Sequence, residues 1–364
     1  MTKSKLGFFL EMKSTSGLPT KCKMYSMFNI SKQLIKHCKS DLSRDIRFIS
    51  SSNRFLNNFR FFSSSSSNSK SFSDKMANVT VFPDIDTATA QILIVDEQTK
   101  NCAILDSVLN YAAASGKTST TSIDKILAVV EEKGYTVQWI LESHIHADHL
   151  SASYYIKSKY PQAKTAIGEG ARTVQKIFKH IFNLEHSFPV DGSQFDVLWK
   201  DGDKFQIGNL NVSVIHTPGH TPACVSYYIE NDCIFVGDTI FMPDVGTARC
   251  DFPEGSAVTL FESMQKILAL PEATKIYVCH DYPPAGRELN YLTTVGEQRK
   301  RNKHVKDGIS REEFIEMRTA RDATLKAPNL LLPSIQVNIR AGELPKPEDN
   351  GIAYIKIPLN YLKQ

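Results

Sequence analysis

The sequence predicts a mixed α/β fold whose strands end in potential metal ligands. Short runs of β-branched and aromatic residues, bounded by Gly, Pro or Asp, are typical of buried strands. Four such runs occupy residues 137–141, 211–215, 233–236 and 276–279. In residues 122–130, the apolar positions 123, 126, 127 and 130 instead have the spacing of an amphipathic helix. The chain has 364 residues and is 41% hydrophobic, which is ample for one large core.

The first run leads into the segment Ser143–His149, which contains three histidines and an aspartate. His144 and His146 are two residues apart, so an extended backbone points both rings to the same side. Asp148 and His149 follow in what must be a turn. So dense a group of nitrogen and oxygen donors suits a divalent ion such as zinc or iron. We therefore predict that this segment binds a metal.

The other three runs also lead to potential ligands. They are followed by His220, Asp238 and His280, respectively. Loops at the ends of strands commonly carry the chemistry of an enzyme, because the sheet beneath them is rigid. We therefore expect these side chains to meet those of Ser143–His149 around one point.

The order of these motifs resembles the metallo-β-lactamase superfamily over roughly residues 78–364. The matching features are the His-x-His-x-Asp-His signature, the Pro-Gly-His turn at His220, the Gly-Asp turn at Asp238 and the final His280. The resemblance implies an α/β fold of the four-layer αββα type, in which two β-sheets pack face to face with helices outside. We expect residues 76–364 to form this catalytic domain.

One branch of the family that the resemblance allows is glyoxalase II, which hydrolyses glutathione thioesters at a dinuclear centre. Carried over to this chain, the first of two Zn²⁺ ions would bind His144, His146 and His220. The second would bind Asp148, His149 and His280, with Asp238 bridging the ions. A hydroxide between the ions would attack the thioester.

The other branch is persulfide dioxygenase, which binds one Fe²⁺ per subunit and oxidises glutathione persulfide, or a similar small persulfide, with O2 to sulfite and free thiol. The resemblance places the iron on His144, His220 and Asp238. Two histidines and one carboxylate leave coordination positions open for O2 and sulfur. Four further residues would surround the iron and bind its ligands, water or substrate: His146 and the catalytic group Asp148, His149 and His280.

Three features favour the dioxygenase branch. An Ala precedes Asp148, as is typical of persulfide dioxygenases, and residues 246–255 resemble their Gly-Arg-x-Asp-Phe-x-x-Gly segment. The tail from Leu332 to Asn360 resembles a longer subgroup labelled β-lactamase-hydrolase-like, whereas glyoxalase II would end in an all-helical lobe. We predict a persulfide dioxygenase, with glyoxalase II as the alternative. A non-catalytic metal-binding module is a minor alternative, because no ligand position is missing.

Two residues are candidates for substrate binding. Arg249 follows Asp238 in a Gly-rich loop, and a guanidinium can bind a glutathione carboxylate bidentately. A structural ion pair with Asp251 is the alternative for Arg249. Tyr282 comes two residues after His280, so it either reaches over the pocket or lies in a surface turn.

Residues 1–75 differ in composition from the rest of the chain. They contain 14 Lys and Arg but 4 Asp and Glu, a net charge of +10, whereas the remainder carries −6. A basic, Ser-rich, acid-poor leader is typical of a mitochondrial transit peptide. We expect import into the matrix, cleavage after about residue 62 and a disordered Ser-rich linker up to residue 75. The alternatives are a nucleic-acid-binding arm and plain surface disorder, although no aromatic-basic recognition module accompanies such an arm.

Composition also bears on the cellular compartment and on binding to membranes and nucleic acids. The seven cysteines are scattered, odd in number and without a Cys-x-x-Cys pair, as in a reduced intracellular protein. No stretch approaches the ~20 apolar residues of a membrane span, so we expect no membrane insertion. The acidic balance of residues 76–364 argues against nucleic-acid binding. A homodimer is one option for the assembly.

Overall fold

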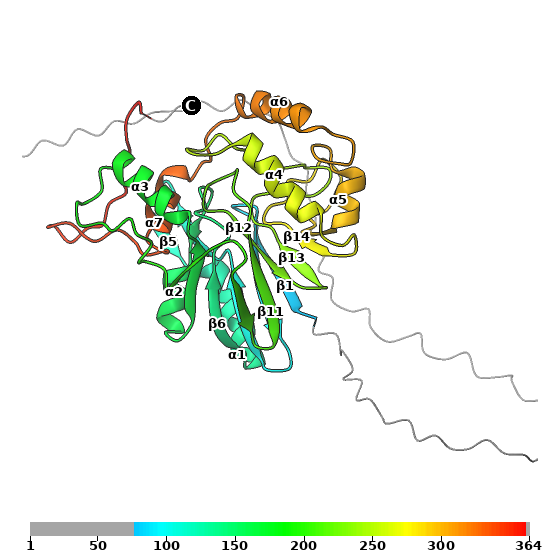
Figure 1. Ribbon diagram of the computed structural model, residues 1–364. Coiled ribbons are helices and arrows are strands. Elements are labelled where there is room, and N and C mark those ends of the chain that lie inside the picture. The colour runs from blue at the N-terminus through cyan, green and yellow to red at the C-terminus, as the bar shows by residue number, and fades with distance from the viewer. Residues whose placement is uncertain (1–75, 362–364) are drawn as a thin grey trace, which may run out of the picture. The chain divides into compact units, whose positions relative to one another are not determined.

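The computed structural model describes residues 76–361, whose centre is formed by two six-stranded sheets (Figure 1). The strands of the first sheet, in the order in which they pair, are β1 (Asn78–Asp84), β2 (Thr89–Asp96), β3 (Asn101–Leu105), β6 (Thr136–Leu141), β8 (Lys164–Gly168) and β9 (Val197–Trp199). The pairs from β1 to β3 are antiparallel, and those from β3 to β9 are parallel.

The second sheet is antiparallel except at one pair. Its strands, again in pairing order, are β10 (Lys204–Ile207), β11 (Leu210–His216), β12 (Val225–Ile229), β13 (Cys233–Phe235), β14 (Lys275–Tyr277) and β15 (Leu292–Thr294). The parallel pair is β13 with β14, so both strands end at the same edge of the sheet. A small third sheet contains β5 (Lys117–Ser119), β4 (Val108–Ala112) and β7 (Leu150–Ser151).

Side chains of β2 alternate between two hydrophobic clusters, which shows how the layers form. Ile92 and Ile94 belong to the core between the sheets, while Leu93 and Val95 pack outward with helix α1 (Thr121–Lys133). Successive strand side chains point to opposite faces, so a strand buried on both faces is apolar throughout. Helix α1 buries Ile123, Ile126, Leu127 and Val130, the positions that its sequence pattern predicts. Helix α2 (Ser153–Lys159) adds Ile156 to the same outer cluster.

Helix α4 (Ala257–Leu268) supplies the outer layer on the second sheet. Its Leu260, Met264 and Ile267 are fully buried in the cluster that also contains the strands of that sheet. Helix α6 (Arg311–Asp322) packs on α4 and contributes the buried Phe314. The predicted four-layer αββα sandwich is therefore confirmed.

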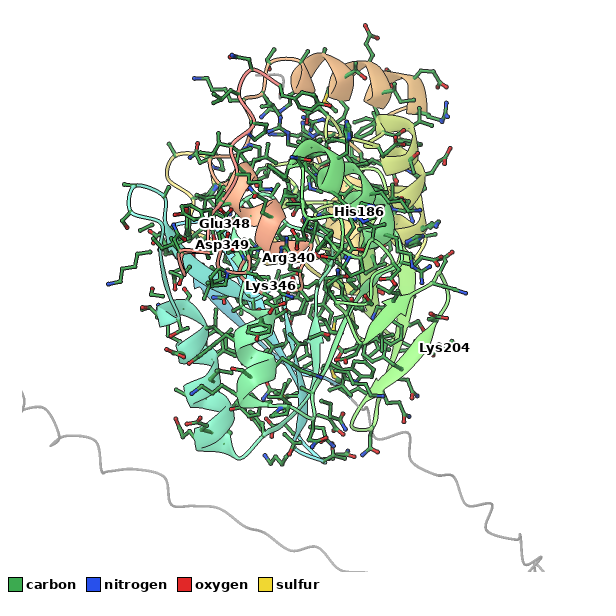
Figure 2. The ribbon with its side chains drawn as sticks, turned by 90° about the vertical axis from the view of Figure 1, so that its left-hand side faces the viewer. His186, Lys204, Arg340, Lys346, Glu348 and Asp349 are labelled. Atoms are coloured by element: carbon green, nitrogen blue, oxygen red, sulfur yellow. The ribbon has the colours of Figure 1, made fainter. Side chains whose placement is uncertain are left out.

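Three helices remain, α3 (Ala171–Ile181), α5 (Val295–Arg301) and α7 (Leu331–Asn338), and α5 packs against α4 and β15. Helices α3 and α7 share a cluster that includes Phe178 and Ile335. Figure 2 shows Arg340, Lys346, Glu348 and Asp349 grouped beside α7, where the chain continues after this helix.

The four strand runs predicted from the sequence are present as β6, β11, β13 and β14. The expected transit peptide and Ser-rich linker, residues 1–75, lie outside the described residues. The five cysteines within residues 76–361 are buried free thiols. No helix in this part of the chain is long and apolar enough to cross a membrane.

Candidate metal centre and active site

Three of the predicted ligands meet at the edge where their strands end. His144 follows β6, His220 follows β11 and Asp238 follows β13, and each is more than nine-tenths buried. One ligand atom of each lies within 4.8 Å of one ligand atom of the other two. The expectation that strand-end loops bring these residues together is therefore met.

The other four predicted donors adjoin this triad. Ligand atoms of His146, Asp148 and His149 lie within 4.8 Å of one another. His280 Nε2 lies 3.4 Å from an oxygen of Asp148 and 3.3 Å from Oδ1 of Asp238. All seven predicted donors thus form one continuous group.

Backbone carbonyls fix the tautomers of two of the histidines. The Nδ1–H of His220 donates to the Arg249 carbonyl at 2.7 Å, and that of His280 donates to the Ala88 carbonyl at 2.8 Å. In a neutral imidazole the second nitrogen then carries a lone pair. For both residues this nitrogen is Nε2, the atom that faces the Asp238 carboxylate.

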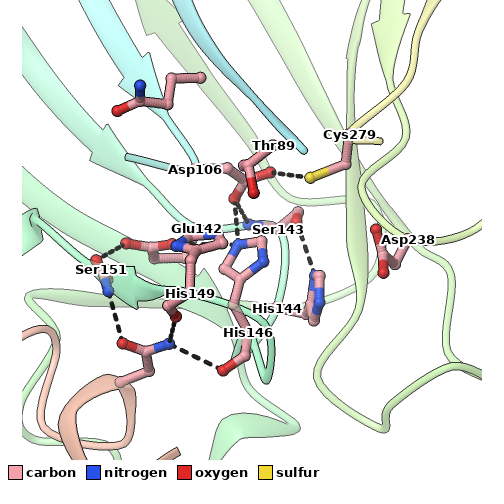
Figure 3. A network of polar contacts seen from close by, with 12 residues as sticks. Thr89, Asp106, Glu142, Ser143, His144, His146, His149, Ser151, Asp238 and Cys279 are labelled. Atoms are coloured by element: carbon pink, nitrogen blue, oxygen red, sulfur yellow. Dashed lines mark hydrogen bonds and ion pairs between the residues drawn. The ribbon is translucent and has the colours of Figure 1, made fainter. Parts of the chain in front are cut away.

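The signature loop orients its own rings in the same way. His149 Nδ1 donates to the Leu150 carbonyl at 3.1 Å, which leaves Nε2 as the acceptor. His146 is turned around, since its Nε2 contacts Asp106 Oδ1 at 2.9 Å and its Nδ1 carries the lone pair (Figure 3). Metal-bound histidines typically donate their other N–H to a carboxylate or carbonyl in this manner.

Several polar atoms of the group are buried without a hydrogen-bond partner. They are His144 Nε2, His146 Nδ1, His149 Nε2 and Asp238 Oδ1. Such atoms are costly to bury unpaired. A cation among them would satisfy these acceptors together, so the residues present fit a metal centre.

Burial and neighbouring charges shift the pKa values of the site residues in different directions. Burial lowers the pKa of His144 well below its usual value, with neighbouring histidines adding to the effect. Burial opposes the charge of His280 as well, but the carboxylates of Asp238 and Asp148 outweigh it and raise the pKa of His280. Burial likewise raises the pKa of Asp148, yet His280, His149 and His146 together lower it to about 2.

Asp106 is an important residue of the site that sequence analysis missed. Its side chain accepts from the backbone N–H of Ser143 at 2.7 Å, contacts His146 Nε2 and receives the Cys279 thiol at 3.6 Å. The His146 ring is oriented by Asp106 at 2.9 Å, while the nearest Asp148 oxygen lies 3.9 Å from His146 Nδ1. Asp106 directly follows β3 (Asn101–Leu105), so the strand-end signal that identified the other donors applies to it too.

Four of the donors, Asp148, His220, Asp238 and His280, line a cavity of about 400 Å³. Tyr282 lines it, is 51% exposed and stacks on the His280 ring with 5.7 Å between centroids. Tyr282 thus reaches over the pocket, as one of its two sequence interpretations expected. Phe241 packs edge-on against both rings. The mouth of the cavity is therefore aromatic, and its floor consists of the metal donors.

Arg249 lines the cavity, but its guanidinium is engaged within the protein. Its Nε and Nη2 donate to the two Asp251 oxygens, each at 2.6 Å, and its Nη1 donates to the Lys326 carbonyl. This is the ion pair that the sequence left open as the alternative to carboxylate binding. Arg249 thus stabilises its own loop, in which the Arg249 backbone carbonyl accepts from His220 Nδ1.

Two arginines of α6 also line the cavity, and sequence analysis did not identify them. Arg318 is buried and donates to Asp322 and to the Thr247 carbonyl. Arg321 is exposed, and no carboxylate of the described residues forms an ion pair with it. No local motif in the sequence marks these positions, because only the packing of α6 on α4 brings them to the cavity.

A search for related families matches residues 86–280 to the metallo-beta-lactamase superfamily. The chain is 68% identical to "Glyoxylase B2" of Dictyostelium discoideum over 79% of its own length and 99% of that protein. It is 48% identical to a "Beta-lactamase hydrolase-like protein" of Xylella fastidiosa, covering 78% of this chain and 65% of the other. The human "Persulfide dioxygenase ETHE1, mitochondrial" is 26% identical over 70% of this chain and 85% of its own.

A solved structure agrees with the sequence relationships. The crystal structure of ETHE1 from Myxococcus xanthus superimposes with a TM-score of 0.58 and 28% identity. The match covers 73% of this chain and 100% of that chain. The donor motif, the αββα sandwich and these relatives agree, and the chain belongs to the metallo-β-lactamase superfamily.

Proposed function

We propose that this protein is a persulfide dioxygenase that holds one Fe²⁺ on His144, His220 and Asp238. The observation that carries the proposal is the composition of this triad, two histidines and one carboxylate, with His220 and Asp238 lining a cavity. That donor set is the one used by non-haem iron oxygenases, because it leaves open positions for O2 and substrate. The similarity to a persulfide dioxygenase over most of its length supports the same assignment.

The proposed reaction converts a persulfide, O2 and water into a thiol, sulfite and two protons. The outer sulfur loses four electrons, and O2 gains them. Iron bound to the triad would supply the activation of O2 and a binding position for the outer sulfur. Water then cleaves the sulfur–sulfur bond, so that the thiol leaves and the oxidised sulfur becomes sulfite.

The chain's own residues would position the water and handle the protons of that cleavage. Asp148 is partly exposed at the cavity and can accept a hydrogen bond from the attacking water. His280 Nε2 lies between Asp148 and Asp238, where it can relay a proton toward the leaving thiolate. His149 completes this group through its contact with Asp148.

For the thiol carrier we propose glutathione, with Arg321 as the residue that binds one of its carboxylates. Arg249 and Arg318 face aspartates of the protein itself, whereas Arg321 has no such partner among the described residues. A guanidinium binds a carboxylate strongly when both are partly desolvated. Tyr282 would cover the sulfur end of the substrate.

A second candidate function is thioester hydrolysis at a dinuclear centre, as in glyoxalase II. The observation in its favour is that Asp238 faces two histidines with different oxygens. Its Oδ2 lies 3.5 Å from His220 and its Oδ1 lies 3.3 Å from His280, the arrangement of a bridging carboxylate. Against it, helices after β15 bury Phe314 and Ile335 in the sandwich and do not extend as a separate lobe.

Metal analysis of anaerobically purified protein tests the choice between the two functions. We expect close to one iron per chain and no requirement for zinc. Two tightly bound zinc ions per chain, together with rapid hydrolysis of S-lactoylglutathione, would overturn the dioxygenase proposal in favour of the hydrolase.

We also propose that the protein acts in the mitochondrial matrix. The basic, acid-poor composition of residues 1–75 supports this location, and the human relative is described as mitochondrial. Fusion of residues 1–75 to a fluorescent reporter should direct the reporter to mitochondria. A diffuse reporter would contradict the proposal.

A further inference from the structure

The signature loop between β6 and β7 depends on a residue almost two hundred positions away. Residues 142–149 form neither helix nor strand, so their backbone groups need partners from elsewhere. At the start of the loop, the Ser143 N–H donates to Asp106 and its carbonyl accepts from Val225. Those contacts fix the end of the loop that contains His144.

The other end of the loop is held by Asn338, the last residue of α7. Its Nδ2 donates to the His146 carbonyl at 2.9 Å and to the His149 carbonyl at 2.8 Å, and its Oδ1 accepts from the Ser151 N–H at 2.7 Å. The amide is 3% exposed, and both of its amino hydrogens and its oxygen are used. These three contacts bracket Asp148 and fix the backbone on both sides of it.

The chemistry of the position requires an amide. Two carbonyls need two donors, and one N–H needs an acceptor, which a carboxylate or a hydroxyl of this size cannot supply together. Helix α7 holds the amide in place because Val337 and Ile335 are buried on either side of the loop. Val337 packs in the cluster of Leu150, and Ile335 packs in the cluster of Ile145.

We infer that Asn338 is a positioning residue for the metal centre, through which the C-terminal segment sets the geometry of His146, Asp148 and His149. The Asn338 side chain bonds to backbone groups of the loop and not to the ligand atoms of its side chains. Asn338 acts by fixing the loop backbone at His146, His149 and Ser151. It therefore affects this end of the loop more than the end that contains His144. The inference holds for one bound ion or two, so it stands apart from the choice of reaction.

The test uses the full chain loaded with Co²⁺, whose visible absorption reports ligand geometry. Asn338→Leu removes all three hydrogen bonds and keeps a side chain of similar volume. Asn338→Asp keeps the oxygen that accepts from Ser151 but places a carboxylate oxygen against the carbonyls of His146 and His149, which repel it. Gln336→Met is the matched control, because Gln336 is a buried amide of α7 that bonds to Leu332 and Lys356 instead. Release of Co²⁺ to a chelator is measured for each variant.

Both Asn338 variants should show an altered Co²⁺ spectrum and roughly 10–100-fold weaker metal retention, the usual effect of losing a residue that supports ligands. Gln336→Met should match the unmodified protein in both measurements. Unchanged spectra and release rates in the Asn338 variants, or equal changes in Gln336→Met, would overturn the inference.

Hydrogen exchange on the unmodified protein covers the case in which the Asn338 variants do not fold. Because the Ser151 N–H is bonded to Asn338, metal binding should slow exchange at Ser151 and in α7 together. Exchange in α7 that does not respond to metal would contradict the inference.

Discussion

The two groups of donors in this protein are positioned in different ways. The triad His144, His220 and Asp238 comes from the loops that follow three separate strands of the two sheets, so the packing of the sheets brings its members together. His146, Asp148 and His149 come from one irregular loop, whose shape depends on side chains outside it. The triad is therefore suited to be the main support of the metal, and changes to the loop group should weaken metal binding less than loss of a triad residue.

Asp106 and Asn338 are the residues outside the loop that position the loop group. Asp106 orients the His146 ring through Nε2, and Asn338 fixes the loop backbone on both sides of Asp148. The triad needs less of this support, since His220 bonds to the Arg249 carbonyl and Asp238 lies three residues after β13. Removing a triad residue should consequently have a larger effect than removing any residue of the loop group.

The largest effect is expected for Asp238→Ala. This change removes the only carboxylate of the triad and its negative charge, so iron retention and oxygen uptake should both fall by more than ~100-fold, beyond the range typical of supporting residues. Metal analysis and an oxygen electrode measure the two quantities. A variant that kept its iron would show that the triad is not the primary metal site.

His280→Ala should separate the two donor groups. In the dioxygenase account the variant keeps its iron, while oxygen uptake falls by roughly 10–100-fold because the partner of Asp148 is lost. In the dinuclear account one metal ion per chain disappears instead. Metal content measured beside activity distinguishes the two outcomes.

Asp106→Asn should change the His146 tautomer. The new amide turns either its N–H or its oxygen toward His146 Nε2. Because an amide is neutral, its hydrogen bonds with His146 and Ser143 are weaker than those of the Asp106 carboxylate. We expect activity to fall by roughly 10-fold or more. Nitrogen-15 NMR of the imidazole should show a shifted tautomer equilibrium, and an unchanged His146 signal would argue against this role of Asp106.

The smallest effect is expected at the mouth of the cavity. Arg321→Gln should leave iron content and kcat unchanged and raise KM for glutathione persulfide by about 10-fold, since hydrogen bonds to charged groups contribute roughly 1.5–3 kcal/mol. A persulfide without carboxylates should show no such change. Arg299→Gln is the control, because Arg299 pairs with Asp307 on the surface of α5.

The sequence predicts the donors well because their signal is local. Each follows a short apolar run, and His144 and His146 are separated by one residue, the spacing that points two side chains to the same side of an extended backbone. Arg318, Arg321 and Asn338 could not be predicted in this way. Their roles come from contacts between residues far apart in the chain, such as the 2.9 Å bond from Asn338 to the His146 carbonyl. For Arg249 the sequence allows both substrate binding and an ion pair with Asp251, and the structure shows the ion pair.

The most direct test of the central claim follows oxygen and sulfite together. Iron-loaded protein is mixed with glutathione persulfide, and O2 consumption is recorded while sulfite is quantified in the same samples. The dioxygenase account predicts about one sulfite released for each O2 consumed, with little hydrolysis of S-lactoylglutathione by the same preparation. No oxygen uptake with persulfide, beside rapid hydrolysis of the thioester, would contradict it.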